Sequence, residues 1–249
     1  MSRIMYMSEA TMTIKMLKLK YGIARFYIIL CLSFFGFQNL DAQQNDFQAW
    51  PSLQVNLEVM NDFKLHLEEE VRFHENLTQV SRQINDLGAS YRFNKHFKAG
   101  IFYRLEADWK NADEYIWRNG MYTDLSVRTD LSRFTLGYRL RFQSAKVERH
   151  SDDRFFDGFR HRHKISAQYD VKGIPLVPFM DAELFVDYSA RTHMINGLRA
   201  WAGLDYTIKK THTVSLKYGI DQEINTNDPL RSYIIALGYT LDLSLVSVK

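Results

Sequence analysis

The chain has 249 residues, of which 46% are hydrophobic and 24% charged, and its formal net charge is +3. Residues 1–42 contain five of the 32 Lys and Arg residues and two of the 29 Asp and Glu residues, which leaves 27 of each sign in residues 43–249. Because this larger part is formally neutral, the charge balance argues against nucleic acid as a partner. The only cysteine, Cys31, also lies in the first 42 residues, so residues 43–249 can form neither a disulfide nor a thiolate metal site.

The first 42 residues have the features of a signal peptide. Basic residues between positions 15 and 25 precede the apolar run FYIILCLSFFGF, residues 26–37. This run is too short for a spanning helix, which needs roughly 20 residues, and suits the core of a signal peptide. We therefore expect cleavage after Ala42 and a mature domain over residues 43–249. A retained N-terminal anchor is the alternative, and a start at Met16 would place residues 1–15 upstream of the true chain.

Residues 53–243 show the alternation of apolar and polar side chains that is typical of strands with two different surroundings on their two faces. In the hairpin formed by 198–208 and 213–221, each strand alternates over about 11 or 12 residues, roughly twice the usual length in a soluble sheet. At about 3.3 Å per residue and a tilt near 40°, this length rises roughly 30 Å, enough to cross an outer membrane. The predicted strands are 53–59, 65–73, 87–93, 99–106, 121–128, 134–142, 159–169, 180–188, 198–208, 213–221 and 233–243.

The connections between these strands alternate in length. Those after 87–93, 121–128 and 198–208 are short, and those after 65–73, 99–106, 134–142, 180–188 and 213–221 are longer. Short periplasmic turns and longer external loops are typical of an antiparallel transmembrane β-barrel, which would place the turn at Lys209 and Lys210 in the periplasm. Eleven strands conflict with the even number of strands that bacterial single-chain barrels have. Either the strand after Trp50 does not span, leaving 10, or one strand is hidden, giving 12.

A soluble exported barrel also alternates, but with its apolar face inward. Three features favour the membrane. The polar face is rich in Gly, Ser, Thr and opposite charges, and tyrosines lie near the ends of the apolar stripes, as aromatic girdles require. The segment from Gly238 to Leu243, GYTLDL, is similar to the C-terminal signal that the outer-membrane insertion machinery binds, although it ends in Leu and six residues follow it. We therefore expect an all-β barrel in the cell outer membrane, in contact with its lipid and lipopolysaccharide.

The strand motifs also indicate a family. Trp50 soon after the leader, LEEEVRF (67–73), FTLGYRLRF (134–142), AELF (182–185), DQEIN (221–225) and ALGYTL (236–241) make the chain similar to the domain of unknown function 2490 family of outer-membrane β-barrels of the Bacteroidota. The resemblance covers roughly residues 47–243. It implies the fold and the location, and it carries no biochemistry, cofactor or catalytic residue.

On the face predicted to line the lumen, positive and negative side chains are expected on different strands. Basic residues lie on two adjoining strands and acidic residues on two others. One interpretation is a narrow pore in which the electric field across the lumen selects small solutes. The other is a closed lumen filled by salt bridges, because few charges stay unpaired in a barrel of this size. The candidate lumen residues are the basic Arg139, Arg141, Arg160, Arg162 and Lys164 and the acidic Glu68, Glu70, Asp181, Glu183 and Asp187.

Two groups of residues could suggest other chemistry. His161 and His163 share a face two residues apart, but no third ligand is evident, so we predict no metal site. His150 with Ser151, Asp152 and Asp153 contains the residue types of a hydrolase, but neighbouring loop residues rarely adopt the geometry. We therefore predict no catalytic residue and no cofactor. The predicted function is a structural envelope barrel or a narrow porin-like channel; the alternatives are an outer-membrane lipid-modifying enzyme or protease and a soluble ligand-binding barrel.

Overall fold

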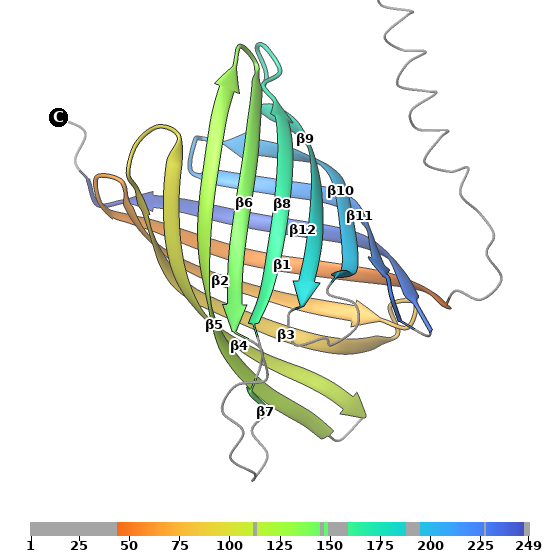
Figure 1. Cartoon of the computed structure of the whole chain (residues 1–249). Helices are drawn as coiled ribbons and strands as arrows, with labels where there is room; N and C mark the ends of the chain where they lie inside the picture. Colours follow the sequence, from red (N-terminus) through yellow and green to blue (C-terminus); the bar gives the residue numbers. More distant parts are fainter. Residues whose placement is uncertain are drawn as a thin grey trace, which may run out of the picture. The chain divides into compact units, whose positions relative to one another are not determined.

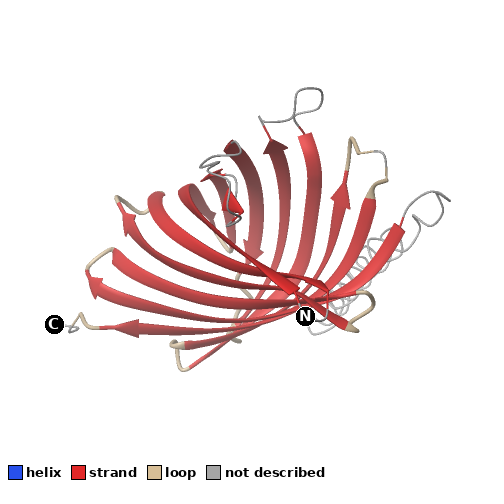
Figure 2. Ribbon diagram, turned by 90° about the horizontal axis from the view of Figure 1, so that it is seen from below, coloured by secondary structure: helices blue, strands red, loops and turns tan. Residues whose placement is uncertain are grey.

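The computed structural model describes residues 44–111, 114–144, 147–148, 159–187, 195–226 and 228–246, and all regular structure in these residues is β-strand (Figure 2). The prediction of an all-β fold is confirmed. No helix in the described part of the chain is both long and apolar enough to cross a membrane. The leader predicted over residues 1–42 lies outside the described residues. The strands are β1 Gln44–Met60, β2 Phe63–His74, β3 Gln79–Arg92, β4 Phe97–Asn111, β5 Glu114–Leu131, β6 Phe134–Ser144, β7 Val147–Glu148, β8 Phe159–Tyr169, β9 Leu176–Asp187, β10 Ile195–Ile208, β11 His212–Glu223 and β12 Leu230–Ser244.

The strands form one closed sheet (Figure 1). The order runs from β4 through β3, β2, β1, β12, β11, β10, β9, β8 and β6 to β5, and β5 pairs with β4 to complete the ring. β7 pairs with β5 only at Asn119 and Arg118, so it adds no strand to the ring. The described barrel therefore has the 12 strands of the sheet less β7, which is 11.

The expectation of an even number of strands was wrong, because the strand that contains Trp50 is a full member of the ring. β1 pairs antiparallel with β2 and parallel with β12, in register from Gln44 opposite Leu230 to Glu58 opposite Ser244. An odd number of strands makes the first and last strands run in the same direction, and a parallel pair satisfies the backbone hydrogen bonds of both. Neither a missing strand nor a hidden twelfth is needed to close the barrel.

The connections fall at two ends of the barrel. We call the end with the turns at 61–62, 93–96, 132–133, 170–175 and 209–211 the short-turn end, and the opposite end the loop end. The predicted difference in length is only partly found, because β4 and β5 extend to residues 111 and 114 and leave two residues between them. The strands predicted at 99–106 and 121–128 therefore ended too early, although Asp108 and Arg118 continue the inward charged face beyond them.

The barrel exposes apolar side chains and buries charged ones. Leu87 and Ile165 are each 60% exposed on the outside, whereas Glu106 and Glu183 are 1% and 3% exposed inside. Glu69 is the exception on the outer face of β2, and the structure gives it a partner: Gln83 Nε2 of β3 donates to Glu69 Oε1 at 2.7 Å. The alternation of the strands therefore places a charged interior inside an apolar surface.

Candidate functional site: the charged lumen

Three cavities follow one another inside the barrel, and the charged candidates line them. The vestibule, about 290 Å³, lies at the short-turn end and the central cavity, about 170 Å³, lies beyond it. A third cavity of about 140 Å³ lies toward the loop end. Arg139 and Lys164 line both the vestibule and the central cavity. The central cavity is also lined by Glu68, Glu70, Arg141, Arg162, Asp181 and Glu183, and Arg160 lines the third.

Opposite charges inside the barrel are paired between neighbouring strands. Arg141 of β6 donates Nε and Nη2 to the two carboxylate oxygens of Asp124 on β5, both at 2.7 Å. Arg160 Nε donates to Asp187 Oδ2 at 2.7 Å, and Lys164 Nζ lies 3.2 Å from Asp181 Oδ2, so these pairs join β8 to β9. Bidentate contacts, in which two guanidinium N–H groups bind the two oxygens of one carboxylate, are stronger than single-bond ion pairs. The basic and acidic walls expected from the sequence therefore adjoin and neutralise each other.

Glu183 is the most connected carboxylate of this set. It is 3% exposed and accepts hydrogen bonds from Arg162 Nη2 and from Arg139 Nη2, each at 2.7 Å. On β2, Glu70 accepts from Arg72 of its own strand at 2.7 Å. Within the described residues no ion pair within 4.0 Å involves Glu68. The central lumen is thus bridged mainly by guanidinium groups held between carboxylates.

A pair of tryptophans occupies the lumen between β1 and β10. The Trp50 and Trp201 rings meet edge to face with their centres 5.7 Å apart, and both are buried. The guanidinium carbon of Arg72 lies 3.7 Å from the Trp50 ring centre, and that of Arg199 lies 4.9 Å from it. Sequence reasoning missed this cluster because it left open whether the strand after Trp50 spans the membrane. The alternation of β1 was the available signal, since Trp50 shares its face with Gln48 and Gln54.

A hydrogen-bonded chain of polar side chains joins four neighbouring strands at the short-turn side of the lumen. Asn56 Nδ2 donates to Asp242 Oδ1 at 2.9 Å, which turns Asn56 Oδ1 toward His66 Nδ1 at 2.7 Å. An oxygen acceptor at Nδ1 favours the tautomer with its proton there, so His66 Nε2 can accept from Ser90 Oγ at 2.7 Å. This arrangement is that of a serine, its base and the residue that orients the base. It was not predicted, because Ser90 and His66 are 24 residues apart.

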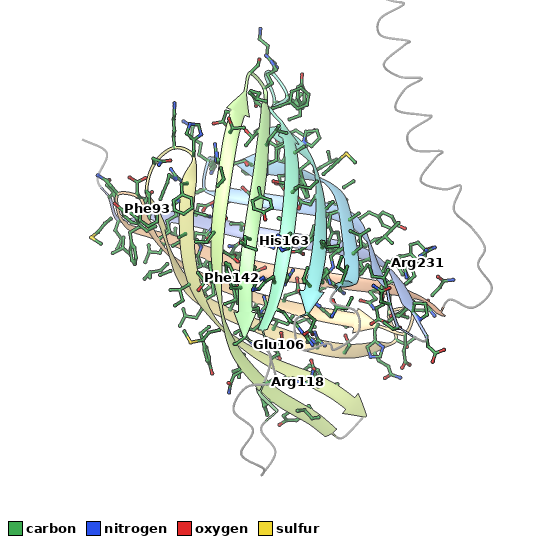
Figure 3. All side chains as sticks on the ribbon, in the orientation of Figure 1. Phe93, Glu106, Arg118, Phe142, His163 and Arg231 are labelled. Carbon is green, nitrogen blue, oxygen red and sulfur yellow. The ribbon has the colours of Figure 1, made fainter. Side chains whose placement is uncertain are left out.

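The other sequence candidates lie elsewhere. His161 and His163 of β8 lie on the same face of the sheet as their ring partners: His163 Nδ1 is 2.8 Å from Tyr138 Oη, and His161 meets Phe142 edge-on. Figure 3 labels His163 and Phe142. The two imidazole centres are 6.5 Å apart, and no group of three or more metal-ligating side chains occurs in the described residues. His150, Ser151 and Asp152 lie outside the described residues.

Comparison with known proteins gives a family and a distant structural similarity. A family model described as "Protein of unknown function (DUF2490)" matches residues 47–231, from β1 to the start of β12. No curated protein sequence matches the chain. Among solved structures, the chain is similar to the translocator domain of the autotransporter NalP from Neisseria meningitidis, with 14% identity, a TM-score of 0.30, and coverage of 67% of this chain and 68% of that one.

Proposed function

The chain belongs to the DUF2490 family, whose description assigns no activity, and we propose that it is an integral outer-membrane protein with a lumen filled by its own side chains. The distribution of side chains carries this proposal: exposed Leu, Ile and Tyr cover the outside of a closed ring, while charged residues are buried inside it. An outward apolar band with a polar interior suits a barrel in lipid, whereas a soluble ligand-binding barrel has its apolar face inside. We infer a structural role in the envelope.

The location is tested by fractionation. We expect the protein in the outer-membrane fraction, with gel mobility that changes when the sample is heated, because a closed barrel resists detergent until it is boiled. Recovery as a soluble periplasmic protein with no heat-dependent mobility would overturn the proposal.

The closed lumen is tested by conductance in planar bilayers. Buried ion pairs and the Trp50–Trp201 pair leave a central cavity of only about 170 Å³ at mid-height, so we expect no current steps above the baseline. Steady steps that fall when Arg139→Ala and Arg160→Ala are combined would support the narrow channel instead, because Arg139 lines the central cavity and Arg160 lines the cavity that follows it.

We propose an orientation in the membrane from the ends of the strands. β12 ends at the short-turn end, where Gly238 to Leu243 form its last part, and we propose this segment as the signal for the insertion machinery. Short turns on the periplasmic side then place the start of β1 at the cell surface, in contact with lipopolysaccharide. A cysteine introduced at Lys210 should react with a membrane-impermeant thiol reagent only after the outer membrane is permeabilised. Reaction in intact cells would reverse the orientation.

Acyl transfer is a second candidate function, favoured by the hydrogen bond between Ser90 and His66. With an ester as acyl donor, Ser90 Oγ would bond to the carbonyl carbon while its proton passes to His66 Nε2 and then to the departing alcohol. Lys64 lies directly opposite Ser90 in the sheet register and could stabilise the oxyanion. Ser90 is only 5% exposed, which suits a structural hydrogen bond equally well.

A fluorophosphonate probe separates these roles. A covalent adduct on Ser90 that is absent from Ser90→Ala and much reduced in His66→Gln would support acyl transfer. Heat-modifiable, folded protein that gains no adduct would leave the Ser90–His66 contact a purely structural one.

A further inference from the structure

The vestibule at the short-turn end is lined by cations from successive strands. Arg92 ends β3, Lys98 begins β4, Arg128 belongs to β5, Arg139 to β6 and Lys164 to β8, and Lys95 lies in the turn between β3 and β4. None of the lining residues is an aspartate or glutamate. Six cationic side chains around about 290 Å³ therefore create a positive potential inside one end of the barrel.

Only part of this charge is neutralised by carboxylates behind the lining. Arg139 pairs with Glu183, Lys164 with Asp181, Arg128 with Asp130 and, at 3.9 Å, Arg92 with Asp62. Lys95 and Lys98 have no ion pair within 4.0 Å in the described residues. Four of the six cations thus have a carboxylate within 4.0 Å and two have none. Because Arg139 shares Glu183 with Arg162, the vestibule has an excess of at least two positive charges.

The remaining lining can donate hydrogen bonds to an anion. Ser126 and Ser166, which carry hydroxyl groups, are among the residues that line the cavity. A side chain at Gly137 would come within 2.4 Å of Ser166 Oγ, so the absence of a Cβ there leaves room beside this hydroxyl. His96 Nδ1 lies 2.9 Å from the carbonyl oxygen of Arg128, which directs its second nitrogen away from the backbone. Lysines, arginines and hydroxyls are the usual donors to phosphate oxygens.

We propose that the vestibule binds a phosphate dianion, either inorganic phosphate or the terminal phosphate of a small soluble ester. An excess of at least two positive charges can neutralise its two negative charges, and the cavity is large enough for a phosphate together with a small organic group. A phosphodiester, such as a lipid headgroup, carries a single negative charge and would leave more of the positive charge unneutralised. The proposal concerns the vestibule alone and is independent of whether the lumen conducts.

Binding of inorganic phosphate to the refolded full barrel in detergent tests this proposal, measured by calorimetric titration at low ionic strength. The test variant is Lys95→Gln with Lys98→Gln. The matched control is Lys209→Gln with Lys210→Gln, which removes the same charge from the β10–β11 turn at the same end without touching the vestibule. Because the test variant loses two charged hydrogen-bond donors, we expect it to bind roughly tenfold or more weakly, and we expect the control to bind like the parent chain.

Titrations with two further ligands identify the source of the phosphate. Glycerol 3-phosphate should bind like inorganic phosphate, and dimethyl phosphate, a diester, should bind much more weakly. Tighter binding of the diester would point to lipid headgroups and contradict the dianion match. Absence of phosphate binding by the folded parent chain, or an equal loss of affinity in the test and control variants, would overturn the proposal. Circular dichroism and heat-dependent mobility establish that each variant is folded.

Discussion

Arg139 of β6 reaches across β8 to Glu183 of β9, with 2.7 Å between Nη2 and Oε1. Arg162 of β8 donates to the same carboxylate, so one buried glutamate joins three consecutive strands from inside the barrel. Removing one partner of a buried ion pair leaves an uncompensated charge, which costs more than the pair itself contributes.

We therefore expect Glu183→Gln to lower the free energy of unfolding by about 3–5 kcal/mol, because two buried guanidinium groups lose their counter-charge. Urea unfolding in detergent micelles, followed by tryptophan fluorescence, measures this change. Glu75→Gln at the loop end is the control, since Glu75 is 57% exposed and should leave the midpoint unchanged. Equal effects of the two substitutions would show that the Glu183 network contributes nothing specific.

Glu69 should behave in the opposite way, because it lies on the outer face and not in the lumen. Its only described partner is Gln83 of the neighbouring strand. We expect Glu69→Leu to stabilise the barrel in lipid vesicles by about 1 kcal/mol, since it removes a carboxylate from an apolar surface. A loss of stability would instead indicate that another molecule covers this part of the surface.

Trp50→Ala should open the lumen. The indole is 4% exposed and is packed against Trp201 and Arg72, so its removal leaves a cavity that costs about 3–5 kcal/mol. We expect current steps in planar bilayers that the parent chain does not give. Trp117→Ala removes the same side chain from the outer face, where Trp117 is 42% exposed, and should give no current. If neither variant gave current steps, other side chains would be sufficient to close the lumen.

The parallel seam between β1 and β12 is open to cross-linking. In a chain with Cys31→Ser, the pair Leu57→Cys and Leu243→Cys should form a disulfide, because these residues are direct register partners. Leu57→Cys with Leu237→Cys is the control, as Leu237 pairs with Pro51 six residues away along the seam. Cross-linking of the control and not of the first pair would place β1 in another register.

Local periodicity was enough to predict most of the barrel. The hairpin predicted from 198–208 and 213–221 is found as β10 and β11, with Ala200 opposite Ile220 on one face and Arg199 opposite Asp221 on the other. The period of two determines which side chains face inward, so the charged lumen residues could be assigned to one face without a structure.

Partners across the barrel could not be predicted in this way. The parallel pairing of β1 with β12 joins residues more than 180 positions apart and has no local signal. The Ser90–His66–Asn56 chain and the excess charge of the vestibule likewise depend on register between strands. Alternation places Lys98 inside the barrel, but only the sheet register shows that Arg92 lies opposite it with no carboxylate between them.

The central claim is that the face predicted to be apolar meets lipid, and adjacent residues of β11 test it most directly. Ser215 faces the lumen and Leu216 is 53% exposed on the outside. Single cysteines at these positions, in a chain with Cys31→Ser, are labelled with a fluorophore in vesicles that contain lipids with spin-labelled acyl chains. We predict strong quenching of the label at 216 and little at 215. Equal quenching at both positions, or stronger quenching at 215, would contradict the account.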